Sequence, residues 1–213
     1  MTAPSPIATH GSSLRERKKA ATEATLRDAA IELCSEGGPD AFTIDDICRR
    51  ANVARRTFFN YFPRKRSAII GWGTTDHARI VHLIVSRSPD EDPLTAVEAV
   101  LCDHVGSTTE APLWARQVVL LAEYPTLREQ FSEYSRDMEA SVAQGISLRT
   151  GISADDIRIT MLAAVMAAAV RTTLTAWFNT DATSDVRKLF TAHVSVLREG
   201  FTDEKSTIGN ANE

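Results

Sequence analysis

The chain has 213 residues, enough to bury one large hydrophobic core or two small ones, and its 43% hydrophobic and 24% charged residues exclude a chain that is disordered throughout. Three cysteines without a pairing pattern argue against a secreted disulfide scaffold, and the formal net charge of −4 argues against a chain that is basic along its whole length. We therefore expect a folded cytoplasmic protein.

The first expected helix begins near residue 13. Residues 1–12 are polar and carry no apolar core of an export signal, so we expect a flexible tail there. Ser13 and Glu16 have the spacing of a capping box, which predicts that a helix starts at this point. The segment Gly37-Gly38-Pro39 predicts its end.

Two short helices are expected next. Thr43 followed by Asp46 is the pattern of a helix N-cap with an acid at the positive end of the helix dipole, and it predicts a helix over about 44–51. Asn52 enters left-handed backbone geometry more readily than most residues and therefore marks a tight turn. A third helix is expected from about Arg55 to Phe62. This arrangement is that of a helix-turn-helix unit, whose second helix fits the major groove of DNA.

The third helix sorts its side chains by chemistry. Phe58 and Phe62 are four residues apart and share one face, which predicts that both are buried. Arg56 and Asn60 fall on the opposite face and offer a guanidinium and an amide, the groups that read guanine and adenine edges. An ordinary solvated surface is the alternative interpretation.

Charge favours the DNA-binding interpretation of this region. Residues 1–66 carry 12 Lys and Arg against 8 Asp and Glu, a net charge of +4, whereas residues 67–213 carry 12 against 20, a net charge of −8. The segment 49–66 holds seven cations and no acid. A basic N-terminal part joined to an acidic body is typical of a protein whose head meets a polyanion.

The remainder of the chain shows helical periodicity and no convincing β-run, so the fold class is predicted to be all-α. We expect a long fourth helix over 64–87, and five further helices over the segments 94–105, 112–123, 125–149, 154–179 and 185–201. The longest apolar run, 159–170, is too short to span a bilayer, and no membrane partner is expected.

Residues 43–69 resemble the N-terminal signature of the TetR family of transcriptional regulators. The matching features are Thr43, the pair Asp46-Ile47, Ala51-x-Val53, Thr57, aromatic residues at 59 and 61, Phe62 and Lys65. The resemblance implies that phosphates are held by Thr43, Thr57, Tyr61 and Lys65, and that base edges are faced by Arg55, Arg56 and Asn60. It therefore divides the chain into a DNA-binding domain over 13–66, an effector-binding and dimerisation domain over 67–201, and a flexible tail over 202–213.

Three positions depart from the family's pattern. Asn52 stands where glycine is usual, which the left-handed tolerance of Asn can absorb. Ala54 stands where a Ser or Thr cap is common, so the recognition helix lacks a side-chain cap. Phe59 stands where Tyr is usual, so a phosphate hydrogen bond is lost and an apolar contact with the DNA remains.

The resemblance also implies that the last two helices pair with those of a second copy as a four-helix bundle. An ordinary monomer core is the alternative. The candidate interface residues are Met161, Val165, Leu189, Phe190, His193 and Leu197.

The middle helices are expected to enclose a small lipophilic effector, although each candidate wall residue could equally belong to a plain core. The candidates are Trp72, Trp114, Tyr124, Phe131, Tyr134, Met138, Met166 and Trp177.

The sequence thus predicts a homodimeric, sequence-specific regulator, a repressor that a small effector releases from a palindromic operator on double-stranded DNA. Two alternatives stay open, an architectural DNA-binding protein without effector control and an all-α enzyme. The sequence shows no catalytic, nucleotide-binding or metal-binding motif, and we expect no cofactor, no metal and no catalytic residue.

Overall fold

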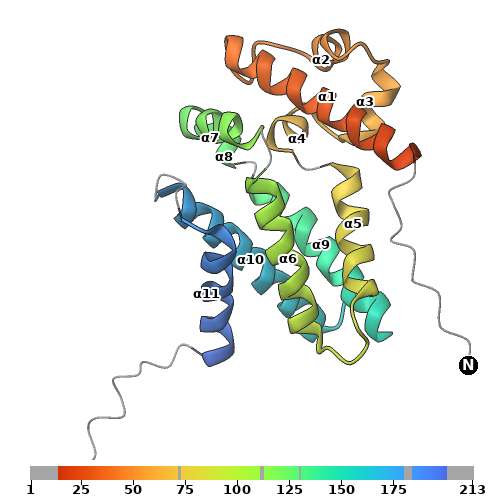
Figure 1. Ribbon diagram of the computed structural model, residues 1–213, viewed down its shortest axis with the longest axis vertical. Coiled ribbons are helices and arrows are strands. Elements are labelled where there is room, and N and C mark those ends of the chain that lie inside the picture. Colours follow the sequence, from red (N-terminus) through yellow and green to blue (C-terminus); the bar gives the residue numbers. More distant parts are fainter. Residues whose placement is uncertain (1–13, 72, 111–112, 130, 180–183, 201–213) are drawn as a thin grey trace, which may run out of the picture. The chain divides into compact units, whose positions relative to one another are not determined.

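The computed structural model describes residues 14–71, 73–110, 113–129, 131–179 and 184–200. Every regular element within these ranges is a helix (Figure 1), which confirms the all-α prediction. The chain forms two compact units that divide between Gly73 and Thr74. The division falls several residues beyond the boundary expected at 66, because α4 packs against α1 and so belongs to the N-terminal unit.

The described part of the N-terminal unit holds four helices, the first three of which occur where the sequence predicts them. They are α1 (Leu14–Gly37), α2 (Ile44–Arg50), α3 (Arg55–Tyr61) and α4 (Lys65–Ile70). The long helix α1 packs against α2 and α4, and α2 packs against α3. The core of the unit is made of side chains that are fully buried, among them Leu26, Ile31, Ile47, Phe58 and Phe62.

Local cap chemistry sets the ends of the two short helices. The Asp46 backbone N–H donates to the Thr43 hydroxyl at 3.2 Å, and the Thr43 backbone N–H donates to the Asp46 carboxylate at 2.8 Å, so the capping box that opens α2 is complete. Asn52 has a φ of 53°, the left-handed geometry predicted for the turn. Ala54 opens α3 without a side-chain cap, as expected. The predicted cap at Ser13 lies outside the described residues.

The predicted long helix over 64–87 is wrong, because α4 ends at Ile70 and α5 (Thr74–Ser86) begins only after Gly73. Gly71 adopts a left-handed φ of 82°, and its N–H donates to the Ser67 carbonyl at 2.9 Å, which closes α4. A β-carbon at Gly71 would collide with the Arg27 guanidinium of α1. The glycine therefore terminates the helix and lets Arg27 approach the backbone, a role that helical periodicity does not reveal.

The C-terminal unit consists of α5 to α11. The helices after α5 are α6 (Pro93–Thr109), α7 (Trp114–Glu123), α8 (Pro125–Glu129), α9 (Phe131–Thr150), α10 (Ile157–Asn179) and α11 (Val186–Glu199). In this unit α9 packs against α5 and α10, and α11 packs against α10 and α6. Helices α8 and α9 cover the single helix expected over 125–149 on either side of Gln130, which lies outside the described residues.

Helix α10 is longer than the apolar run seen in the sequence. Its segment Ile157–Trp177 is long and apolar enough, by length and composition, to cross a membrane. In the fold this helix packs between α9 and α11 and buries Met166, Val170 and Leu174. Within the most apolar window of the helix 44% of the residues are buried, so this packing accounts for part of its apolar composition.

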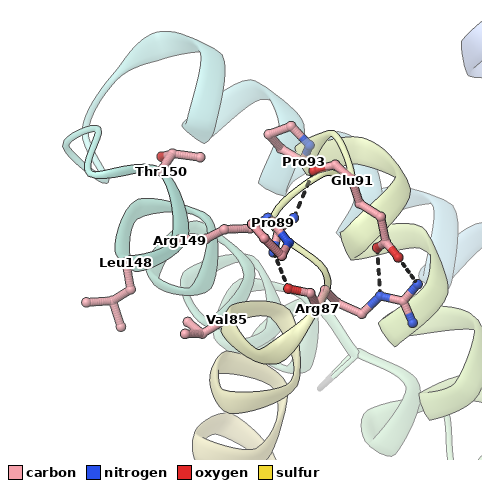
Figure 2. A pocket seen from close by; sticks show the side chains of 8 residues that line it. All are labelled: Val85, Arg87, Pro89, Glu91, Pro93, Leu148, Arg149 and Thr150. Carbon is pink, nitrogen blue, oxygen red and sulfur yellow. Dashed lines mark hydrogen bonds and ion pairs between the residues drawn. The ribbon is translucent and has the colours of Figure 1, made fainter.

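Arg149 connects the end of α9 to the segment between α5 and α6 through hydrogen bonds (Figure 2). Its guanidinium donates to the carbonyl of Arg87 at 2.9 Å and to that of Glu91 at 2.8 Å, and it also contacts the carbonyl of Ser88. Beside it, Arg87 pairs with Glu91 at 2.6 Å. These groups line a pocket of about 470 Å³ together with Val85, Leu148 and neighbouring side chains.

Candidate nucleic-acid interface

Helix α3 presents two chemically different faces, as the sequence predicts. Phe58 and Phe62 are fully buried, and their ring centroids lie 5.8 Å apart. Arg56 and Asn60 are exposed. The buried rings fix the rotation of this short helix about its axis, so the polar face is held at the surface of the unit.

Arg55 is held by partners on two helices. Its Nη1 donates to both carboxylate oxygens of Asp45 in α2, at 2.8 and 2.9 Å. Its guanidinium carbon also lies 5.6 Å from the centre of the Phe59 ring. Sequence reasoning placed Arg55 on the reading surface but did not identify Asp45 as its partner, because the ten-residue separation follows no regular period and the pair forms only when α2 and α3 pack.

The phosphate candidates lie at the start of α2, within α3 and at the start of α4. Thr57 and Tyr61 are half-buried. Lys65 donates to the Phe42 carbonyl at 2.7 Å, and its ammonium lies 4.6 Å from the centre of the Phe42 ring. An ammonium has three N–H donors, so Lys65 keeps donors for a further acceptor. The Thr43 hydroxyl donates to Asp46 at 2.7 Å, and its proton is therefore already used within the capping box.

The other charges near α2 and α3 form exposed ion pairs. Arg49 lies 2.8 Å from Asp46, and Arg66 lies 3.3 Å from Asp40. The hydrogen bonds from Thr43 and Arg49 lower the pKa of Asp46 to about 2. Arg56, by contrast, forms no ion pair with any residue that the structure describes, so its positive charge stays available to a polyanion.

The candidate effector residues of the C-terminal unit are mostly internal. Trp114, Met138, Met166 and Trp177 are buried, and the two tryptophan rings lie 6.0 Å apart. Tyr124 is half-buried, Phe131 begins α9, and Trp72 lies outside the described residues. None of these candidates lines the pocket beside Arg149.

A polar pair that the sequence did not indicate lies in the same unit. The hydroxyl of Tyr134 is 3.2 Å from Nε2 of His104 on α6, and His104 is buried. Burial raises the pKa of the Tyr134 phenol well above its usual range, and the nearby Asp76 carboxylate adds to this effect. Tyr134 therefore stays protonated and can donate or accept a hydrogen bond inside the unit.

The candidate dimer residues divide between surface and core. Met161 is 58% exposed, and Val165, Leu189 and Leu197 are half-buried. His193 is also half-buried, with its Nδ1 2.9 Å from the Thr173 hydroxyl.

Phe190 is fully buried within the protomer. It therefore belongs to the core that α11 forms with its own neighbours rather than to a surface that a second copy could contact. The apolar stripe on α11 does not distinguish core residues from interface residues. Apolar side chains at helical spacing occur both on the buried face of the helix and on the half-buried positions beside it.

Two family models match the chain. The model described as "Bacterial regulatory proteins, tetR family" matches residues 26–67, and the model described as "MftR C-terminal domain" matches residues 91–202.

Among curated proteins, the HTH-type transcriptional regulator TcmR of Streptomyces glaucescens is 29% identical over 197 residues, covering 88% of this chain and 86% of its own. A Mycobacterium tuberculosis protein named as a regulator of mycofactocin biosynthesis, MftR, is 31% identical over 144 residues, covering 63% of this chain and 69% of its own. Among solved structures, the complex of SmeT with triclosan gives a TM-score of 0.50 at 17% identity, covering 83% of this chain and 91% of that chain. At this identity the likeness concerns the fold alone.

Proposed function

Because the chain belongs to the TetR family of DNA-binding transcriptional regulators, we propose that it is a repressor that releases a palindromic operator when a small lipophilic effector binds its C-terminal unit. The observation that carries this proposal is the exposed Arg56 and Asn60 face of α3, held in place by the buried Phe58 and Phe62. The family consists of regulators rather than enzymes, which supports the assignment of a regulatory role in the cytoplasm.

In this proposal α3 enters the major groove of the operator. Arg56 and Asn60 face base edges, where a guanidinium can pair with guanine and an amide with adenine. Thr57, Tyr61 and Lys65 hold backbone phosphates, which fix the register of the helix without selecting sequence. For Thr43, whose hydroxyl proton is used by Asp46, we propose either that the hydroxyl turns its proton from Asp46 to a phosphate oxygen when DNA binds, or that its role is limited to capping α2.

The C-terminal unit is proposed to pair with a second copy through α10 and α11. A single short helix makes few base contacts, and helix-turn-helix proteins therefore act as two-fold dimers whose half-sites lie about 34–36 Å apart or multiples of that distance. The exposed Met161 and the half-buried Val165, Leu189, His193 and Leu197 supply the proposed surface.

The same unit is proposed to hold the effector. The neighbouring rings of Trp114 and Trp177, with Met138 and Met166, offer apolar contacts suited to a lipophilic molecule. Tyr124, Phe131 and Trp72 remain proposed wall residues. The pair of Tyr134 and His104 adds a hydrogen-bonding group that can orient a polar end of the ligand.

Two variants test the DNA-binding part. We expect Arg56→Ala to weaken operator binding by about 1–3 kcal/mol and to relax preference at one base pair, because a bidentate base contact is lost. Lys65→Ala should weaken binding to all sequences alike, because a phosphate contact carries no sequence information. Both are measured by titration against the operator and a scrambled duplex. Equal losses on both duplexes for Arg56→Ala would contradict the base contact.

The effector part is tested by operator titrations with and without a candidate ligand that saturates the C-terminal unit. A coupling of about 1–3 kcal/mol between the two sites would lower operator affinity roughly 5- to 150-fold. Constant operator affinity in the presence of saturating ligand would favour the architectural alternative without effector control.

A further inference from the structure

Arg55 and its two partners form a small cluster on the surface of the N-terminal unit. Within the described residues, Nη1 is the guanidinium atom of Arg55 that donates hydrogen bonds, and both go to Asp45. A guanidinium carries five N–H donors in a rigid fork. The edge formed by Nε and Nη2 therefore keeps two parallel donors. This pattern matches the two acceptors, O6 and N7, that a guanine presents in the major groove.

The surroundings fix the direction of this edge. Asp45 on α2 holds one side of the guanidinium, and the Phe59 ring lies against it at 5.6 Å. An arginine without such partners loses the conformational entropy of a long side chain when it binds a base. A side chain that is already oriented loses less conformational entropy on binding. The cluster therefore favours base recognition over a loose contact with phosphates.

The placement of Asp45 is informative because an acid facing DNA costs affinity. Asp46, its neighbour, is used by the capping box and by Arg49, but Asp45 makes its hydrogen bonds to Arg55. The Asp45 and Arg55 side chains are 57% and 58% exposed, so the pair lies at the surface of the N-terminal unit, where the adjacent Arg56 is also exposed. A carboxylate in this position repels phosphates and so lowers the affinity for DNA. A gain in sequence selectivity would offset this loss of affinity.

We propose that Asp45 is a positioning residue that orients Arg55 to read a guanine in each operator half-site, with Phe59 supporting the guanidinium. The inference rests on the proposed function, since it assigns a specificity role within the same DNA-binding surface. It assigns Phe59 a role in holding Arg55 rather than only in touching the DNA.

The test starts from an operator selected with the full-length protein from random duplexes, followed by binding to every single-base-pair substitution of one half-site. For the wild-type chain, replacement of one G·C pair should lower the affinity about 5- to 150-fold, which is the range expected for loss of a bidentate base contact. Arg55→Ala should abolish the preference at that pair alone. Arg55→Lys should do the same while keeping affinity for scrambled DNA, because lysine retains the charge but lacks the fork.

Asp45→Asn is the decisive variant. It should lose preference at the same base pair as Arg55→Ala, and bind scrambled DNA at least as tightly as the wild-type chain because an acid has been removed. Asp40→Asn is the matched control, since it removes an acid that pairs with Arg66 in the same unit and leaves Arg55 untouched. This control should keep the base preference. Circular dichroism at the binding temperature checks that each variant is folded.

Three outcomes would count against the proposal in distinguishable ways. If Asp45→Asn keeps the wild-type preference at every position, Asp45 does not orient Arg55. If it tightens binding to all duplexes equally and changes no preference, Asp45 only masks a positive charge. If selection yields no preferred sequence at all, the proposed function itself fails, and this inference with it.

Discussion

The uncapped start of the recognition helix offers a sharp test of local energetics. Ala54 is exposed and has φ −71° and ψ 149°, the extended geometry of an N-cap, but it has no side-chain oxygen to accept the first backbone N–H groups of α3. The Thr57 N–H reaches the Ala54 carbonyl at 2.8 Å, which leaves α3 with a tight first turn and no cap. A threonine at this position has the right backbone conformation and adds the missing acceptor.

We expect Ala54→Thr to stabilise the protein by about 1 kcal/mol, the typical value of an N-cap hydrogen bond. In a chain of this size that corresponds to a rise in Tm of roughly 2–4 °C, or roughly 4–8 °C if the N-terminal unit unfolds in its own transition. Ala54→Val is the matched control, because valine has nearly the same shape as threonine and no oxygen. Thermal and urea unfolding followed by circular dichroism at 222 nm measure both variants.

The comparison of the two variants isolates the hydrogen bond from the effect of side-chain bulk. An unchanged urea slope would show that stability itself has changed rather than the compactness of the unfolded chain. If threonine and valine give the same unfolding free energy, the first N–H groups of α3 are already satisfied in solution and the cap argument is refuted.

Three further predictions concern the N-terminal unit. The pKa of Asp46 is lowered from its ordinary value of 3.8 to about 2 by Thr43 and Arg49, so its capping box contributes stability that is present above about pH 4 and is lost as the pH falls towards 2. Asp46→Asn should remove this dependence, and unfolding curves at pH 5 and pH 2.5 measure it; an equal pH dependence in the variant would contradict the assignment. Phe58→Ala should cost about 3–5 kcal/mol of stability because the ring is fully buried and packs on Phe62. Phe59→Ala, whose ring is 44% exposed, should change stability by no more than about 0.5 kcal/mol and reduce operator selectivity instead. Urea unfolding and operator titration separate the two, and a large loss of stability for Phe59→Ala would show that this ring is part of the core.

Three features of the N-terminal unit were predictable because their signals are local. Thr43 and Asp46 lie within one turn of each other, and the turn at Asn52 depends on the backbone preference of a single residue. Phe58 and Phe62 follow from helical periodicity alone. Each of these features is fixed by residues within a few positions along the chain, so the sequence contains all of the relevant information.

Features that depend on packing between distant segments were not predictable. Gly71 ends α4 because it takes left-handed geometry and accommodates Arg27 from α1, a contact across more than forty positions of the chain. Asp45 and Arg55, and likewise Tyr134 and His104, meet only after their helices have packed. Phe190 shares its stripe with more exposed neighbours, and periodicity cannot tell which of them faces the protomer's own core.

The hydrogen bonds of Arg149 in the C-terminal unit do not involve a group that is protonated in acid. Its partners at Arg87, Ser88 and Glu91 are backbone carbonyls, which do not titrate, and an arginine keeps its positive charge at every pH at which a protein stays folded. No proton is gained or lost on either side of these hydrogen bonds. These hydrogen bonds of Arg149 thus do not depend on a titrating group, whereas the neighbouring Arg87–Glu91 ion pair, which lowers the pKa of Glu91, and the Thr43 and Asp46 cap at the start of α2 both weaken once their carboxylates are protonated.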